Sequence, residues 1–343
     1  MECGGSAAAF QRGGAALRAV GKRRQSRRTP SSAAGPRSPE PTAASWGADD
    51  NLAMKRVSLS LLLMFLAACA SAPPRDLASR VDAVLAAHPR QVIAVSYHDL
   101  ASGETFERNE RTVFHAASTM KVPVMLGIFE AVTRGALSLD QPVQVRNEFV
   151  SIFDGSKYSL ESREDSDKAL YDEIGREVPL ENLVRRMIVR SSNLATNIVI
   201  EFVGAKRIMA LMKEIGANDI QVLRGVEDDK AYHAGMNNTA TAHDLMLVFK
   251  TLGQRKAVNA EASAMMLQVL GAQEFNDGIP GGLPKGTRVE HKTGSITEIA
   301  HDAGLVDGKY VLVVLTKGFR KHDDAEKVIA EISRIVWESR KTD

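Results

Sequence analysis

The stretch TRVEHKTGSITEIAHDAGLVDGKYVLVVL, residues 287–315, decides the fold. Its runs 287–293, 300–306 and 310–315 are strand-like, because each is short and lies between turn residues. Asp307-Gly308 between the last two runs is a strong signal for a tight hairpin turn. An amphipathic helix then closes the chain, and its apolar face carries Val328, Ile329, Ile332, Ile335 and Val336.

Two more strands are expected near the start of the foldable region. Residues 76–85 have the apolar spacing of a helix. Residues 92–97 and 104–106 are strand-like and enclose the turn residues 101–103, so they predict a hairpin. The middle of the chain is dominated by helical patterns, at residues 119–134, 180–190, 193–204, 206–215, 241–253 and 260–270.

This order of elements predicts an α/β fold of the α+β kind. A five-stranded antiparallel sheet is assembled from both ends of the chain and flanked by helices. An all-helical subdomain, at about residues 119–270, is inserted between the two sets of strands. We expect a functional site where the sheet and the inserted subdomain meet.

The residues ahead of this domain resemble targeting sequence. Residues 54–68 resemble a bacterial lipoprotein signal peptide, with Lys55-Arg56, a short apolar run and then Cys69 as the acylated residue. We expect a lipid anchor and linker at residues 69–75 and a periplasmic protein, with outer-membrane anchoring favoured because no Asp follows the cysteine. The alternative is a short buried helix that ends in cysteine.

Residues 1–53 are rich in Gly, Ala, Ser, Pro and Arg and show no apolar period. They are either a disordered extension or the result of an over-extended start, since a signal peptide belongs at the N-terminus. A mitochondrial-type presequence is the rival interpretation, and it does not explain a lipoprotein signal directly after it.

Charge and cysteine content exclude several classes of protein. The net charge of +2 contains +4 from residues 1–53 and +2 from residues 54–68, which leaves −4 for residues 69–343. The folded part therefore has no basic excess for phosphates, and we expect no nucleic-acid partner. Cys3 and Cys69 are the only cysteines, so neither a disulfide framework nor a cysteine metal site holds the domain together.

Ser118-Thr119-Met120-Lys121 is the first candidate for chemistry. On a helix Ser118 and Lys121 share a face. A serine hydroxyl needs a base to act as a nucleophile, and a lysine with a lowered pKa can be that base. The pattern alone is weak, because a Ser followed three residues later by a Lys arises by chance about once in a chain of this size.

Two further motifs have ordinary alternatives when each is taken alone. Ser191-Ser192-Asn193 lies between two helical patterns, where it either aims polar groups into a cleft or caps the following helix. Lys292-Thr293-Gly294 lies on a predicted strand, where the lysine could be an exposed residue of an edge strand.

Together, the motifs Ser-x-x-Lys, Ser-x-Asn and Lys-Thr-Gly, in this order, resemble the signature of class A β-lactamases and penicillin-binding proteins. The resemblance spans about residues 76–340 and includes Leu283–Thr287 ahead of the last motif. It implies a β-lactamase/transpeptidase-like fold and a serine hydrolase domain over residues 76–343.

The resemblance gives the catalytic residues their roles. It implies that Ser118 attacks an acyl carbonyl, that Lys121 helps to remove its proton, and that Ser191 relays a proton to the departing nitrogen. It also implies that Asn197 ties down the loop that carries a deacylating glutamate. None of this chemistry requires a metal or another cofactor.

The same resemblance implies a substrate-binding set. Asn193 binds the side-chain amide of the substrate, and Lys292 and Thr293 hold its carboxylate. Gly294 and Ser295 continue that strand, and the backbone N–H of Ser295 joins that of Ser118 in an oxyanion hole.

The surroundings of the glutamate that would activate the deacylating water differ from the family pattern. Glu227 has the family spacing after Ser191, but Ala231 stands where the family usually has an asparagine that shares the water. Asn237 and Asn238 are possible substitutes. Because Asp228 and Asp229 follow it, Glu227 could instead be one charge of a solvated acidic loop.

Two other departures concern the Ser-x-Asn motif and its surroundings. Ser192 stands where the family usually has aspartate, and the stretch 147–177 is longer than the common pattern. The sequence names no arginine that assists Lys292.

The leading hypothesis is a class A β-lactamase that confers β-lactam resistance through an acyl-enzyme on Ser118. The alternatives are a penicillin-binding DD-peptidase with slow deacylation and a non-catalytic cell-wall sensor. We expect a β-lactam or a peptidoglycan stem peptide as ligand, a membrane contact through Cys69, and a monomer.

Overall fold

The computed structural model describes residues 76–340. The expected extension 1–53, the signal peptide 54–68, the linker 69–75 and the lipidation of Cys69 lie outside these residues. The helices are α2 (Leu77–Ala87), α3 (Lys121–Thr133), α4 (Leu180–Val189), α5 (Asn193–Val203), α6 (Ala205–Ile215), α7 (Asp229–His233), α8 (Ala242–Gly253), α9 (Ala260–Leu270) and α10 (His322–Ser339), with 3₁₀ turns η1 (Ala117–Met120), η2 (Lys168–Glu173) and η3 (Pro280–Gly282).

The main sheet is antiparallel and five-stranded, in the order β2-β1-β11-β10-β9. The hairpin from the front of the chain joins the last strands through β1, which pairs with β11 so that Val92 lies opposite Lys317. The fold class and the assembly of the sheet from both ends of the chain are therefore as predicted. The strands of this sheet are β1 (Val92–Asp99), β2 (Thr105–Arg108), β9 (Val289–Ile296), β10 (Ile299–Val306) and β11 (Tyr310–Lys317).

The predicted turn after β10 has the backbone of a tight hairpin. Asp307 and Gly308 have φ angles of 52° and 65°, and the N–H of Lys309 donates to the carbonyl of Val306 at 2.9 Å. Asp and Gly adopt such positive φ angles at low cost, which explains why this dipeptide joins the two strands.

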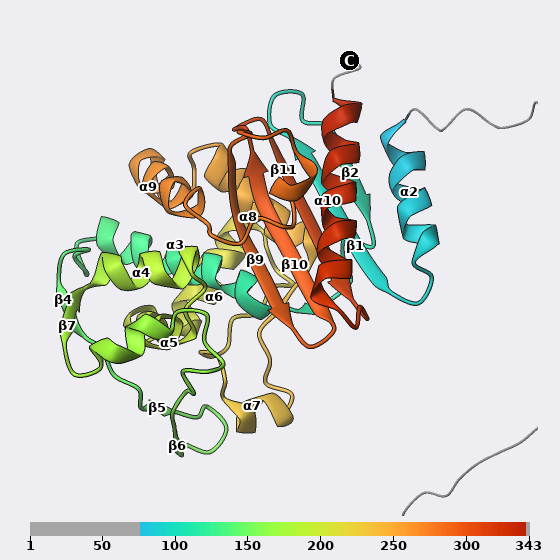
Figure 1. The fold of residues 1–343 in the computed structure, drawn as a ribbon. Coiled ribbons are helices and arrows are strands. Elements are labelled where there is room, and N and C mark those ends of the chain that lie inside the picture. The colour runs from blue at the N-terminus through green and yellow to red at the C-terminus, as the bar shows by residue number, and fades with distance from the viewer. Residues whose placement is uncertain (1–75, 341–343) are drawn as a thin grey trace, which may run out of the picture. The chain divides into compact units, whose positions relative to one another are not determined.

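Helices cover both faces of the sheet (Figure 1). α10 and α2 pack on one face, and α8 packs on the other against β1, β10 and β11. Strand β11 is buried on both faces: Val311, Val313 and Leu315 join the core on the α8 side, while Leu312 and Val314 join the core under α10. This double burial explains why β11 is continuously apolar rather than alternating.

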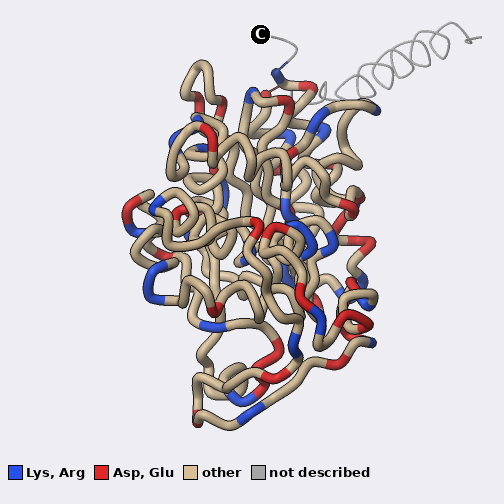
Figure 2. The backbone as a smooth tube through the Cα atoms, turned by 90° about the vertical axis from the view of Figure 1, so that its left-hand side faces the viewer, with Lys and Arg blue, Asp and Glu red and all other residues tan. Residues whose placement is uncertain are grey.

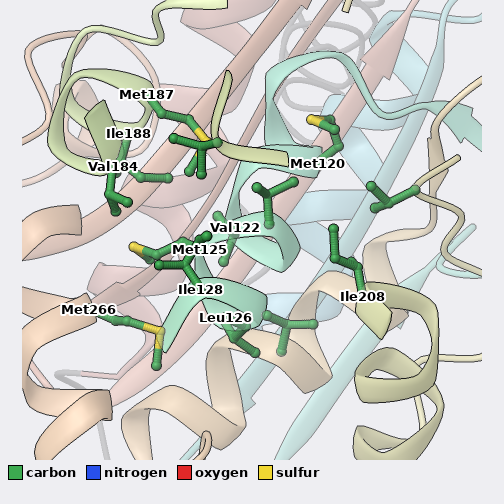
Figure 3. Close-up of a cluster of buried hydrophobic side chains, with 14 of the residues drawn as sticks. Met120, Val122, Met125, Leu126, Ile128, Val184, Met187, Ile188, Ile208 and Met266 are labelled. Carbon is green, nitrogen blue, oxygen red and sulfur yellow. The ribbon is translucent and has the colours of Figure 1, made fainter. Parts of the chain in front are cut away.

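Helix α3 forms the centre of the inserted subdomain. Residues 121–131 of this helix are buried, and Figure 3 shows its side chains packed among residues of α4, α6 and α9. Because α3 is surrounded on all sides, the residues at its start are held by a close-packed scaffold. The labelled neighbours include Val184, Met187 and Ile188 of α4, Ile208 of α6 and Met266 of α9.

The inserted subdomain also contains short strand pairs, so it is not all-helical as predicted. Pairings of two or three residues carry no periodicity, so no pattern in the sequence indicated them. These pairs join β3 (Phe114–His115) to β8 (Thr239–Ala240), β4 (Pro142–Gln144) to β7 (Glu177–Pro179), and β5 (Phe149–Val150) to β6 (Lys157–Tyr158).

Charged residues of both signs are interspersed along the described backbone (Figure 2). Within residues 76–340, no helix is long and apolar enough to cross a bilayer. In the same range, no group of three or more His, Cys, Asp and Glu side chains could hold a metal ion.

Candidate active site

Ser118 lies in the 3₁₀ turn η1, immediately before α3, and is partly exposed. Ala117, just ahead of it, has a φ of 47°, a strained value for a residue other than glycine. Strand β9 passes directly beside this turn, because a Cβ placed on Gly294 would lie 2.9 Å from the backbone nitrogen of Ser118. Glycine at position 294 thus allows the close approach of β9 to the turn.

Lys121 is fully buried below this turn. Its Nζ donates to the carbonyl of Ser191 at 2.6 Å, to Ser191 Oγ at 3.1 Å and to Asn193 Oδ1 at 2.8 Å. Burial lowers the pKa of Lys121 to about 7, although the negative charges of Asp165 and Glu227 act against this shift. The lysine is therefore close to the midpoint of its titration near neutral pH, as a general base should be.

Lys292 approaches the same serine from the sheet. Its Nζ donates to Ser191 Oγ at 3.0 Å and to the carbonyl of Thr293 at 2.9 Å. Burial, together with the charge of Lys121, holds the pKa of Lys292 well below its usual value. Strand β9 is indeed an edge strand, but Lys292 is fully buried, so the alternative of an exposed surface lysine is wrong.

The turn Ser191-Ser192-Asn193 both caps a helix and lines the cleft, and different residues serve the two purposes. Ser192 caps α5, because its Oγ accepts from the N–H of Ala195 at 3.2 Å. Ser191 and Asn193 line the cleft beside Ser118. Ser191 has a φ of 57°, so the backbone at this turn is strained where it presents the hydroxyl.

Glu227 lines the cleft together with Ser118 and Asn193. Its Oε1 accepts a hydrogen bond of 2.7 Å from Asn193 Nδ2. Burial is the main cause that raises the pKa of Glu227, while the hydrogen bond from Asn193 acts against it. Asp228, next in the chain, is buried and caps α7, so the alternative of a solvated acidic loop is wrong for these two residues.

The cleft has two sides that meet at Ser118. One, the Thr293 side, has a volume of about 230 Å³, and the other, the Glu227 side, has a volume of about 300 Å³. Ser118, Asn193 and Ser295 line both sides. Among the described residues, no arginine lines the Thr293 side, which instead contains Glu164, Asp277, Asp302 and Glu326.

The arrangement joins a partly exposed serine at a helix start, a buried lysine of lowered pKa, a second serine between two lysines, and a carboxylate. A family model described as the β-lactamase enzyme family matches residues 76–339. The chain belongs to this family.

Known proteins with low sequence identity to this chain agree with this assignment. The β-lactamase VEB-1 of Pseudomonas aeruginosa is 22% identical over 83% of this chain and 97% of its own length. A β-lactamase from Sphaerobacter thermophilus has a solved structure with a TM-score of 0.68, is 27% identical, and aligns over 77% of this chain and 98% of that one. PBP-A has a solved structure with a TM-score of 0.66, is 23% identical, and aligns over 78% of this chain and 96% of that one. The β-lactamase/transpeptidase-like architecture expected from the sequence is thereby confirmed.

Asn197 holds the loop that carries Glu227. Its Oδ1 accepts from the N–H of Val226 at 2.6 Å, and its Nδ2 donates to the carbonyl of Val226 at 3.0 Å. A Cβ on Gly225 would lie 2.3 Å from Asn197 Oδ1, so only glycine leaves room for this contact. The asparagine thus ties α5 to the residue before Glu227, in agreement with the resemblance to the family.

The asparagine that usually follows the family's glutamate has no simple substitute. Ala231 is buried in α7. Asn238 lines the Glu227 side, but its Oδ1 accepts from the N–H of Leu223 and its Nδ2 donates to the carbonyl of Arg224. Asn237 Oδ1 accepts from the guanidinium of Arg224. Both side-chain amides thus support the backbone and guanidinium ahead of Glu227.

Sequence reasoning missed Asp165. This carboxylate is buried in the long stretch 147–177, and its Oδ2 accepts from the N–H groups of Asn193 and Leu194 at 2.9 and 2.8 Å. One signal could have found it: Ser192 leaves the motif without its usual aspartate, and a nearby carboxylate could compensate.

The structure brings all the described site residues of the sequence prediction to one cleft: Ser118, Lys121, Ser191, Asn193, Glu227, Lys292, Thr293, Gly294 and Ser295.

Proposed function

We propose that this family member is a serine β-lactamase of the class A type, which hydrolyses the β-lactam amide through an acyl-enzyme on Ser118. The observation that carries the proposal is the 2.7 Å hydrogen bond that aims Glu227 into the cleft beside Asn193. A carboxylate of raised pKa, at the side of the nucleophile, is suited to activate the water that releases the acyl group.

Acylation uses the buried lysine and the two serines. Neutral Lys121 takes the proton of Ser118 as Oγ forms a bond to the lactam carbonyl carbon. The backbone N–H groups of Ser118 and Ser295 stabilise the oxyanion. As the C–N bond breaks, Ser191 gives its proton to the nitrogen and regains one from Lys121 across the 3.1 Å contact, which restores the neutral lysine.

Deacylation uses the opposite side of the cleft. Glu227 takes a proton from a water molecule while the oxygen of that water attacks the carbonyl carbon of the ester. The bond from the carbonyl carbon to Ser118 Oγ breaks, and the proton returns to that oxygen. The raised pKa of Glu227 keeps it basic enough for this exchange near neutral pH.

A penicillin-binding DD-peptidase is the second candidate. Ala231 removes the amide that would share the deacylating water, which favours an enzyme that releases its acyl group slowly. A PBP-A variant, which shares 23% of its sequence with this chain, has a solved structure as an acyl-enzyme with penicillin G. The acylation residues are common to both candidates, so the rate of deacylation decides between them.

A time course of intact mass with excess benzylpenicillin tests the proposal, with Ser118→Ala as the matched control. We expect an adduct on the parent protein that clears as the drug is consumed, and no adduct on the variant. An adduct that never clears, together with cleavage of a D-Ala-D-Ala peptide, would assign the DD-peptidase. No adduct at all would remove Ser118 as nucleophile and favour a non-catalytic sensor.

We also propose that the chain is a periplasmic lipoprotein acylated at Cys69. The support is the charged start, the short apolar run and the cysteine of residues 54–69. Fatty-acid labelling and membrane fractionation should detect a lipidated protein in a bacterial host, and Cys69→Ser should abolish both signals. Labelling that persists in the variant would exclude this site.

A further inference from the structure

We propose that Asp165 is a positioning residue for acylation, which holds the Ser191–Asn193 turn from outside the motif. It supplies from the stretch 147–177 the carboxylate that position 192 lacks. The inference rests on the proposed function only through the acylation step, which the β-lactamase and the DD-peptidase share.

The contacts of Asp165 are concentrated on the start of α5. Its Oδ2 accepts from the N–H groups of Asn193 at 2.9 Å and Leu194 at 2.8 Å, and lies 3.4 Å from Ser192 Oγ. The first N–H groups of a helix have no partners within it, so a buried carboxylate that accepts two of them fixes the helix start. Asn193 is the residue whose side chain bonds both Lys121 and Glu227. Asp165 therefore sets the position of the side chain at the centre of the cleft.

The stretch that carries Asp165 is itself attached to the neighbouring helix. The carboxylate of Asp167 accepts from Arg186 of α4 at 3.1 Å and from Arg190 at 3.3 Å. Ser166 Oγ donates to the carbonyl of Arg190, the residue directly before Ser191. The N–H of Asp167 donates to Asp165 Oδ1 at 2.9 Å, and Tyr171 donates to Oδ2 at 3.2 Å. All these contacts keep Asp165 against the turn rather than in solvent.

Ser192 and Asp165 together accept the hydrogen bonds at the start of α5, where the family usually has an aspartate in the motif. Ser192 Oγ accepts from the N–H of Ala195. Asp165 accepts from the N–H groups of Asn193 and Leu194, which lie between Ser192 and Ala195 in the chain. An aspartate at the N-cap position 192 could accept from the N–H groups of Leu194 and Ala195 from within the turn, and would place a negative charge at the same helix start. A carboxylate at 192 should therefore replace the one at 165, whereas both together would repel each other.

Asp165 also contributes to the electrostatics of Lys121. Three charged groups face this lysine: Asp165 from the long stretch, Glu227 from the loop before α7, and Lys292 from β9. The negative charge of Asp165 favours the ammonium form, so it raises the pKa of Lys121 against the effect of burial. Removal of this charge should lower the pKa of Lys121 further, which extends acylation to lower pH. A purely structural residue would not have this effect.

The test measures the second-order rate constant for acylation by benzylpenicillin, across pH, in the full-length protein. The variants are Asp165→Asn, Asp165→Ala, Ser192→Asp and the double variant Asp165→Ala with Ser192→Asp. Glu161→Gln is the matched control, because it removes an exposed carboxylate from the same stretch. Thermal melting of each variant verifies that the domain is folded.

We expect Asp165→Ala to lower the acylation rate at the plateau by roughly 10- to 100-fold, because the turn loses its anchor. Asp165→Asn keeps one oxygen that can accept from the turn but loses the charge, so its plateau should fall less. The acid limb of the profile should move to lower pH in both variants. Ser192→Asp should slow the parent, yet it should restore most of the rate in the Asp165→Ala background. Glu161→Gln should behave as the parent.

Acylation of folded Asp165→Asn at the parent rate, with an unmoved acid limb, would overturn the inference. A double variant no faster than Asp165→Ala would overturn it too, since the carboxylate could not then act from position 192. If Asp165→Ala does not fold, the Asn variant and its pH profile decide. A parent that benzylpenicillin fails to acylate would instead contradict the proposed function.

Discussion

Asn193 donates a 2.7 Å hydrogen bond to Glu227, and the other end of the same amide accepts a 2.8 Å hydrogen bond from Lys121. One side chain thus joins the base assigned to acylation with the base assigned to deacylation. A substitution of either base can change the position of the other through this amide. Acylation and deacylation must therefore be measured separately.

The first prediction concerns deacylation. Glu227→Gln keeps the size of the side chain and its acceptor for Asn193, but it removes the base. We expect deacylation to slow by roughly 10²- to 10⁴-fold while acylation changes much less, because general-base catalysis contributes on that order. Intact mass spectrometry with excess benzylpenicillin should then show a persistent adduct.

The matched control for this change is Glu161→Gln. Glu161 is an exposed carboxylate that lines neither side of the cleft. The Glu161→Gln variant should clear its adduct at the parent rate. Rapid clearance by Glu227→Gln would show that another group activates the water.

The second prediction concerns pH. Because the pKa of Lys121 is about 7 and only the neutral amine can accept the proton of Ser118, the acylation rate should fall as pH drops through about 7. Above that pH the rate should reach a plateau. Lys121→Arg, which stays protonated, should lose acylation at every pH. A parent rate that is flat between about pH 5 and 9 would exclude Lys121 as the base.

The sheet and the positions of several cleft residues could be predicted from the sequence because their signals are local. The turn Asp307-Gly308 and the apolar run of β11 lie within one short stretch, and Ser118 and Lys121 are one helical turn apart. The burial of Lys292 could not be predicted, because the turn at Ser191 that covers it is 101 residues away in the sequence. Periodicity describes one element at a time, whereas burial depends on what packs against it.

Asp165 shows the same limit more sharply. It lies among several acidic residues of an irregular stretch, 28 residues before Asn193, and nothing in its own neighbourhood distinguishes it. The departure at Ser192 indicates a missing carboxylate, but only the structure shows which acidic residue lies against the turn.

The third prediction concerns the loop that carries Glu227. Asn197→Ala removes both hydrogen bonds to Val226, so Glu227 should lose its position and deacylation should slow by roughly 10- to 100-fold. Gly225→Ala should produce the same defect, because the new Cβ meets the side chain of Asn197 at 2.3 Å.

A double variant of these two positions provides the control. Once Asn197 is alanine, the added methyl group at 225 has room, so Asn197→Ala with Gly225→Ala should be no slower than Asn197→Ala alone. Single-turnover clearance of the adduct measures this. Fully additive losses would contradict a direct contact between the two residues.

The fourth prediction follows from the titration of Lys121 on unfolding. In the folded protein its pKa is about 7, against 10.5 as the ordinary value. Between these pH values the unfolded chain binds a proton that the folded chain does not, so this residue makes the free energy of unfolding rise with pH, by at most about 1.4 kcal/mol per unit.

The variant Lys121→Met lacks this contribution. Its loss also relieves Lys292 of a neighbouring charge, which reduces the proton deficit of Lys292 and enlarges the difference in the same direction. Urea unfolding at several pH values from about 6 to 9 should therefore show the parent gaining stability relative to Lys121→Met as pH rises. A difference in stability between parent and variant that stays constant over this range would mean that Lys121 remains charged in the folded protein.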